Sequence, residues 1–147
     1  MSDKRSVLIL LADDDVDDRE MARDALVESR LKNEMRFVEH GVELLEYLCH
    51  RGKYAVPSSA PRPGLILLDL NMPKMDGREA LCEIRRNPDL RRIPVIIMTT
   101  SQAEEDIARS YDLGANSFIK KPINFVALVE VMRSLGRYWF EIVELPE

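Results

Sequence analysis

Several features that define common protein classes are scarce or missing in this sequence of 147 residues. Its two cysteines, Cys49 and Cys82, lie inside helical patterns without metal-ligand spacing, so we expect small buried hydrophobic residues in a reducing compartment. No apolar run approaches the ~20 residues of a membrane span. The first residues lead directly into a predicted strand, without the pattern of a signal peptide. We therefore expect a soluble cytoplasmic protein.

Positively charged residues do not outnumber negatively charged ones either. The formal net charge is -5 and the sequence pI is near 5.2, which argues against a surface for nucleic acid or anionic membrane. With 46% hydrophobic and 32% charged residues, the chain has the composition of one ordinary globular domain. Its length is sufficient to bury a core without disulfides.

Short apolar segments alternate with helical patterns along the chain. The predicted strands are 6–12, 35–39, 65–70, 93–99 and 116–121, and the predicted helices are about 17–30, 41–51, 75–87, 102–113 and 123–137. Segment 52–64 is rich in Pro, Ser and Gly, so we expect an exposed loop without regular structure. The alternation predicts a single-domain α/β fold over 1–137, a doubly wound parallel sheet with the flavodoxin-like strand order 2-1-3-4-5. A hydrophobic tail, 138–147, follows it.

Acidic side chains follow two of the predicted strands at their carboxyl ends. Asp13 and Asp14 follow the first strand, and Asp69 follows the third. In the predicted order these strands are neighbours, so the three carboxylates should meet. Clustered carboxylates repel one another unless a cation lies between them, and Mg²⁺ prefers such oxygen ligands. The sequence therefore predicts a magnesium site at this edge of the sheet.

The last two strands contribute hydroxyl and ammonium groups to the same edge. The fourth strand ends in the hydroxyl residues 99–101, and the fifth ends in Lys120 and Lys121. Because side chains alternate along a strand, Lys121 shares a face with Ile119, and Lys120 shares the other with Phe118; we favour Lys121 for the site. Carboxylates, a metal, hydroxyls and an ammonium group together suit an anion with several oxygens, such as a phosphoryl group.

Three further aspartates exceed what such a site requires. Asp17 and Asp18 fall in the first turn of a predicted helix, where the helix dipole favours negative charge, and we expect them to act there rather than as ligands. We expect Asp15 to be solvated.

Four segments resemble the signature of two-component response-regulator receiver domains. They are Ala-Asp-Asp-Asp at 12–15, Leu-Asp-Leu-Asn-Met-Pro-Lys-Met-Asp-Gly at 68–77, Met-Thr-Thr-Ser at 98–101 and Lys-Pro at 121–122. The resemblance covers 7 to about 135. It implies that Asp69 is the phospho-acceptor and that a sensor histidine kinase is the donor.

The same resemblance implies a role for each residue of the motifs. Mg²⁺ would be bound directly by Asp14, through water by Asp13, and by Asp69 and the backbone carbonyl of Asn71. Thr99 and Lys121 would bind phosphoryl oxygens, with a cis peptide between Lys121 and Pro122, and Phe118 would turn inward with Thr99 on activation. Pro122 and Gly77 would be structural. The domain would be no enzyme, although it would catalyse its own Mg²⁺-dependent phosphorylation and dephosphorylation.

Cyanobacterial phytochrome-associated response regulators show a closer resemblance over nearly the full length. The resemblance rests on three segments, which are the Pro-rich insertion 52–64, the block Arg-Arg-Ile-Pro-Val at 91–95 and the tail 138–146. This resemblance implies a light-sensing histidine kinase as the donor. No DNA-binding or enzymatic output domain follows in the sequence, so we expect the signal to pass to an unidentified protein partner or to self-association.

The last predicted helix and the tail carry more apolar residues than one buried stripe requires. Core spacing accounts for five residues of the helix, namely Phe125, Leu128, Val129, Met132 and Leu135. Val126 and Val131 lie off that stripe, and the tail adds six more apolar residues. The tail either covers its own domain or, as we favour, packs with the last helix in a two-fold homodimer.

Two other functions fit parts of the pattern. Residues 13–16 match the first motif of haloacid-dehalogenase-type phosphatases, with Asp13 as nucleophile and Thr99 or Thr100 and Lys121 as later motifs. That chemistry needs a further acidic pair after the lysine, where the sequence offers only Glu130, and it leaves Asp69 unexplained. A receiver-shaped module that has lost phosphorylation is the third possibility, which the intact motif residues disfavour.

Overall fold

The computed structural model describes residues 7–31, 33–99, 111–121 and 124–137. Within them, one parallel sheet is formed by β1 (Ile9–Ala12), β2 (Met35–Val38), β3 (Leu65–Leu68), β4 (Val95–Thr99) and β5 (Ser117–Lys120). The strand order is β2-β1-β3-β4-β5, so the predicted flavodoxin-like order is confirmed. Each strand is slightly shorter than its apolar segment predicts.

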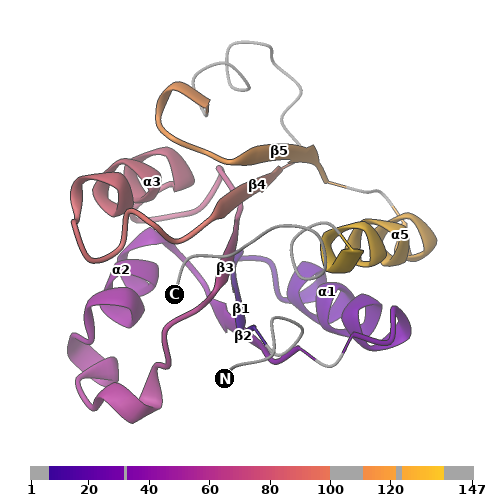
Figure 1. The fold of residues 1–147 in the computed structure, drawn as a ribbon, viewed down its shortest axis with the longest axis horizontal. Coiled ribbons are helices and arrows are strands. Elements are labelled where there is room, and N and C mark those ends of the chain that lie inside the picture. Colours follow the sequence, from indigo (N-terminus) through magenta and orange to yellow (C-terminus); the bar gives the residue numbers. More distant parts are fainter. Residues whose placement is uncertain (1–6, 32, 100–110, 122–123, 138–147) are drawn as a thin grey trace.

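Helices cover both faces of this sheet, which explains why β1, β3 and β4 are buried along their whole length. On one face lie α1 (Val16–Glu28) and α5 (Phe125–Leu135), and on the other lie α2 (Gly41–Cys49) and α3 (Gly77–Arg86) (Figure 1). Alternate strand residues enter two separate hydrophobic clusters, with Leu10 on the α2–α3 side and Leu11 on the α1–α5 side. Most of the predicted helix 102–113 lies outside the described residues.

The insertion between α2 and β3 differs from the prediction of a loop without regular structure. It contains two short 3-10 helices, η2 (Gly52–Tyr54) and η3 (Pro57–Ser59). Contacts with the rest of the domain order the insertion: Tyr54 Oη, in η2, donates to Glu43 Oε2 at 2.8 Å, and Arg36 donates to Ser59 O, in η3, at 3.0 Å. Tyr47 Oη donates to Pro61 O at 2.8 Å. Ala60 is thereby buried in the α2–α3 cluster.

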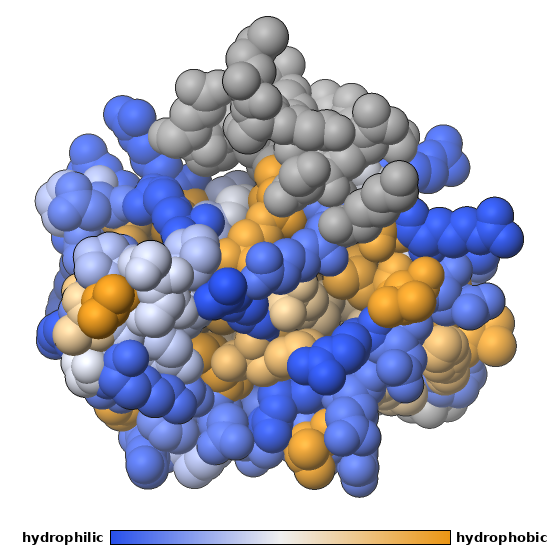
Figure 2. Space-filling model, turned by 90° about the horizontal axis from the view of Figure 1, so that it is seen from below, coloured by the Kyte–Doolittle hydropathy of each residue, from blue (hydrophilic) through white to orange (hydrophobic). Residues whose placement is uncertain are grey.

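The prediction that both cysteines are buried is wrong. Cys49 and Cys82 are free thiols that both remain partly exposed, because they lie at the margin of the helix faces that reach the core. Figure 2 shows one face of the molecule, where hydrophobic areas are separated by hydrophilic side chains. No helix in the described part of the chain combines the length and apolar character needed to cross a membrane.

Gly77 begins α3 where this helix approaches the end of β3 most closely. A Cβ atom at Gly77 would lie 2.3 Å from the carbonyl oxygen of Asp69 and 2.8 Å from Leu70 Cα. The amide of Gly77 donates to Leu70 O at 2.9 Å. Only glycine permits this approach, which holds the turn after β3 against the strand end and fixes the backbone of Asp69.

Candidate functional site

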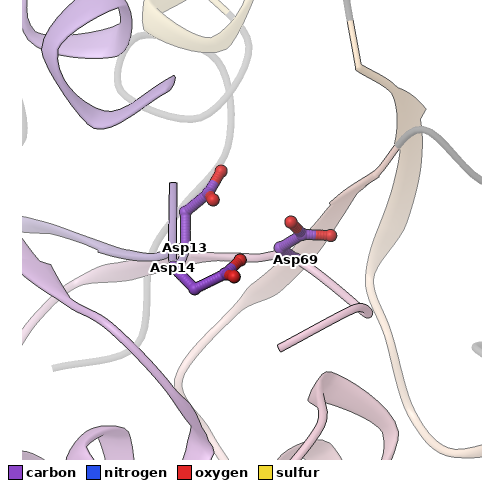
Figure 3. Close-up of side chains that lie close together, drawn as sticks. All are labelled: Asp13, Asp14 and Asp69. Atoms are coloured by element: carbon purple, nitrogen blue, oxygen red, sulfur yellow. The ribbon is translucent and has the colours of Figure 1, made fainter. Parts of the chain in front are cut away.

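Asp13, Asp14 and Asp69 meet at the carboxyl edge of the sheet (Figure 3). They follow β1 and β3, which pair in register with Ala12 beside Leu68, and the amide of Asp69 donates to Ala12 O at 3.0 Å. One carboxylate oxygen from each aspartate lies within 4.8 Å of the others. Asp13 and Asp69 are buried, and Asp14 is exposed. The predicted acidic cluster is present, with one of its members open to solvent.

Lys121 extends from the end of β5 into this cluster. Its Nζ lies 2.6 Å from Asp13 Oδ2, 2.7 Å from Asp18 Oδ2 and 3.4 Å from Asp69 Oδ2. The backbone amide of Lys121 donates to Thr99 O at 2.7 Å, so β4 fixes where the side chain starts. Lys120 is exposed. Lys121, which the alternation of side chains along the strand favours over Lys120, is therefore the lysine that contacts the carboxylates.

The electrostatics of the cluster favour an additional cation. Burial raises the pKa of Asp13 above its ordinary value, although the hydrogen bond from Lys121 opposes this rise. Burial lowers the pKa of Lys121, but its hydrogen bonds to Asp13 and Asp18 outweigh that effect and raise the pKa above the ordinary value. The ammonium group is thus firmly charged, yet it neutralises only part of the negative charge of the carboxylates around it.

Asn71 and Thr99 lie on the other side of Asp69. The amide of Asn71 donates to Asp69 Oδ1 at 3.2 Å, and its side-chain Nδ2 donates to Thr99 Oγ1 at 3.5 Å. Thr99 is completely buried. The predicted role of the Asn71 carbonyl oxygen stays a prediction.

Phe118 lies on β5, next to the strand that carries Thr99. It pairs with Ile97 in the register of β4 and β5, and both side chains enter the α2–α3 cluster. Thr99 follows Ile97 by two residues, so Thr99 and Phe118 face the same side of the sheet. Phe118 also lines a groove of about 450 Å³ between β5 and α5.

The three further aspartates lie at the N-terminus of α1, where Asp15 is the N-cap and Asp17 and Asp18 are in the first turn. Asp15, exposed as expected, also caps α1, because its Oδ1 accepts the amides of Asp17 and Asp18 at 2.8 and 3.1 Å. Asp17 is exposed, as a dipole partner can be. Asp18 lies in the first turn as well and in addition contacts Lys121, a contact that the sequence does not predict. No local pattern separates Asp18 from Asp17, since both are acidic and both lie in the first turn of α1.

A divalent metal fits the donor set of this cluster. Three carboxylates converge from two neighbouring strand ends, and hard cations such as Mg²⁺ and Mn²⁺ prefer carboxylate oxygen. The partial exposure of the cluster leaves room for the water ligands that Mg²⁺ retains. The predicted cis peptide before Pro122 and the hydroxyls of Thr100 and Ser101 lie outside the described residues.

The family model of the response regulator receiver domain matches residues 9–133 of this sequence. The chain belongs to this family. Receiver domains accept phosphoryl groups, bind a divalent metal at an acidic pocket and act with sensor histidine kinases. The match favours this function over the phosphatase alternative, because the receiver motifs include Asp69 and its following turn, which the phosphatase motifs leave unexplained.

Relatives of this receiver domain include response regulators of phytochrome systems. Response regulator Rcp1 of Synechocystis sp. is 40% identical over 139 residues, covering 95% of this chain and 92% of Rcp1. The Mn²⁺-bound structure of Rcp1 aligns with a TM-score of 0.85 over 96% of this chain and 99% of that one. The phosphorylated cyanobacterial phytochrome response regulator RcpA aligns with a TM-score of 0.88 at 41% identity, with the same coverage. A response regulator in red light signaling of R. palustris aligns with a TM-score of 0.91 at 33% identity.

Proposed function

We propose that this receiver domain accepts a phosphoryl group on Asp69 from a sensor histidine kinase and passes the signal on through protein–protein contacts. One observation carries the assignment of Asp69. Its carboxylate lies among Asp13, Asp14 and Lys121 on one side and the Asn71–Thr99 pair on the other. A phosphoryl group on Asp69 would therefore be surrounded by the groups that phosphoryl transfer requires.

In the reaction, a carboxylate oxygen of Asp69 forms a bond to phosphorus as the phosphorus–nitrogen bond of a phosphohistidine breaks. The product is a mixed anhydride on Asp69, and the electron pair of the broken bond stays on the histidine nitrogen. Acetyl phosphate would serve in the same way, with acetate as the leaving group. The chain mainly positions groups and neutralises charge, which is what transfer through a loose transition state needs. Hydrolysis of the anhydride in the same site would limit its lifetime.

Mg²⁺ is the metal that we propose for the site. Asp14, Asp69 and the backbone carbonyl of Asn71 would hold it directly, and Asp13 through water. When bound, it supplies positive charge beside the transferred oxygens. Lys121 orients the phosphoryl group from the α1–α5 side, and Thr99 approaches it from the α2–α3 side.

Thr99 and Phe118 form the proposed switch. A phosphoryl group on Asp69 would draw the Thr99 hydroxyl toward it, and Phe118 would move into the space that the threonine leaves. The register of β4 and β5 supports this coupling, because both residues face the same side of the sheet. The conformational signal would then reach the groove that Phe118 lines next to α5.

The proposed donor is a phytochrome-type histidine kinase. Similarity to Rcp1 and RcpA over nearly the whole chain supports it, since RcpA is itself a phytochrome response regulator. The downstream protein remains to be identified. A cytoplasmic location, predicted from the sequence, stays a prediction.

We also propose a homodimer formed by α5 and the tail 138–147. Val126, at 75% exposure, supports an additional partner for α5, whereas Val131 proves to be partly buried against the α1–α5 cluster and no longer argues for one. The tail lies outside the described residues. Removal of 138–147 should give a monomer by light scattering, and a truncated protein that stays dimeric at the same concentration would contradict the proposal.

Phosphorylation with acetyl phosphate tests the proposed function. Incubation with acetyl phosphate and Mg²⁺ should shift the mobility of the wild-type protein in a Phos-tag gel, and Asp69→Asn should abolish the shift. Asp89→Asn changes an exposed aspartate that is not part of the site. It is the matched control and should behave as the wild type. A shift that survives Asp69→Asn and disappears in Asp13→Asn would support the phosphatase chemistry instead.

A further inference from the structure

Asp18 and Asp69 share the ammonium group of Lys121 unequally. The Nζ atom lies 2.7 Å from Asp18 and 2.6 Å from Asp13, but 3.4 Å from Asp69. A lysine has three donors, and these two shorter contacts take two of them. The ammonium is therefore held most closely by carboxylates other than the proposed phospho-acceptor.

The N-terminus of α1 does not depend on the Asp18 carboxylate. Asp15 Oδ1 accepts the amides of Asp17 and Asp18, so a neighbouring side chain provides the cap. The dipole of α1 favours Asp17 and Asp18 alike. It does not account for the ion pair of Asp18, whose side chain is 30% exposed beside a lysine side chain that is 14% exposed. The position of Asp18 is explained by Lys121.

The surroundings of Lys121 allow its ammonium group to change partners. A cavity of about 20 Å³ adjoins Asp13, Asp18 and Lys121, and its other walls include Met21 and Met98. Methionine side chains are unbranched and adapt easily to a moved neighbour. The backbone of Lys121 is fixed by its hydrogen bond to β4, so the exchange requires motion of the side chain alone.

We propose that Asp18 is a positioning residue that holds Lys121 in the unphosphorylated protein and competes for it with a phosphoryl group on Asp69. This inference rests on the proposed function of the site. While Asp18 holds the ammonium group, the oxygens of Asp69 and Asp14 remain available to a divalent cation. Phosphorylation reverses the balance, since Lys121 then leaves Asp18 for the phosphoryl oxygens. Asp18 thus strengthens metal binding and weakens retention of the phosphoryl group.

Two binding measurements on Asp18→Asn test this competition. Without Asp18, Lys121 turns toward Asp69 and Asp13 and competes with the metal, so Mg²⁺ affinity measured by calorimetry should fall about three- to fivefold, the effect of one well-formed ion pair. At saturating Mg²⁺, the affinity for beryllofluoride, a phosphoryl mimic that can be followed by fluorine NMR, should rise by about the same factor. A merely structural role of Asp18 would weaken both.

Asp17→Asn is the matched control, because it removes the same charge from the same helical turn without touching the contact with Lys121. It should change both affinities by less than about twofold, as expected for a screened exposed charge. Asp18→Glu keeps the carboxylate and should restore both values toward the wild type. Equal beryllofluoride affinities in Asp18→Asn and Asp17→Asn would overturn the inference. A wild-type protein that binds no beryllofluoride with Mg²⁺ would instead overturn the proposed function.

Discussion

Glu43 and Asp13 are both nearly buried carboxylates with a lysine partner, yet their surroundings are opposite. Glu43 accepts three donors: Lys53 Nζ at 2.6 Å, the Tyr54 hydroxyl at 2.8 Å and the amide of Glu39 at 2.7 Å. At the functional site, one ammonium group serves Asp13 and two other carboxylates. Glu43 has a lysine of its own, whereas one lysine faces three carboxylates at the site.

The pKa values of the two carboxylates follow this difference. Burial raises the pKa of both, but for Glu43 the hydrogen bonds from Lys53, Glu39 and Tyr54 outweigh it and bring the pKa below the ordinary value. For Asp13 burial prevails and the pKa is raised. A carboxylate with its own lysine joins η2 to α2, whereas the cluster with one lysine for three carboxylates keeps negative charge that can bind a cation. The number of cations per carboxylate thus separates the structural cluster from the binding one.

Lys121→Met should produce the largest effect, because it removes the ammonium group that Asp13, Asp18 and Asp69 share. The free energy of unfolding without metal should fall by about 2–3 kcal/mol, since two buried carboxylates, Asp13 and Asp69, lose their lysine partner. Urea unfolding with and without Mg²⁺ measures it. Mg²⁺ should stabilise the variant more than the wild type, because the cation replaces the missing positive charge. An equal Mg²⁺ effect in both proteins would contradict the comparison.

Glu43→Ala should destabilise the protein by about 2 kcal/mol, because the amide of Glu39 and the partly buried Tyr54 hydroxyl lose a charged acceptor. This loss should be the same with and without Mg²⁺ in urea unfolding, since Glu43 has its own lysine partner and is not one of the carboxylates proposed to bind the metal. Glu83→Ala, which removes a carboxylate that is 48% exposed and paired with Arg86, is the control and should cost less than about 0.5 kcal/mol.

Asp13→Asn should stabilise the metal-free protein at neutral pH by about 1 kcal/mol, because it relieves a charge whose burial is unfavourable. The pKa of Asp13 is higher in the folded state than in the unfolded state, so the folded state binds more protons at this group and the contribution of Asp13 to stability falls as pH rises from about 4. The gain from the variant should therefore grow over that range in urea unfolding. For Glu43, whose folded pKa is lowered, the contribution to stability should instead be lost as pH falls.

The smallest expected effect is on the titration of Tyr54. Burial and the hydrogen bond to Glu43 raise the pKa of Tyr54 to about 12. In Glu43→Gln the acceptor loses its charge, so ultraviolet absorbance should show this tyrosine titrating closer to the ordinary value of about 10. Stability that depends on neutral Tyr54 is present below the ordinary value and lost as pH rises through the folded pKa. An unchanged titration curve would show that burial alone causes the shift.

The sequence by itself determined the sheet and the identity of the residues at its carboxyl edge. Continuous apolar runs specify buried parallel strands, and such strands place Asp13, Asp14, Asp69, Thr99 and Lys121 at one rim whatever the details of the loops. Period-two alternation was sufficient to favour Lys121 over Lys120, since it depends only on backbone geometry. These predictions rest on local rules, which a single chain displays directly.

Only the tertiary structure decided how the charges at that rim are shared. Asp17 and Asp18 are equivalent in sequence, both acidic and both in the first turn of α1, but only the packing of α1 beside the end of β5 gives Asp18 its contact with Lys121. The insertion 52–64 is likewise held by tertiary contacts, from Glu43 to η2 and from Arg36 to the end of η3. Such contacts join segments far apart in the chain, and their geometry depends on helix placement, which no local pattern of residues encodes.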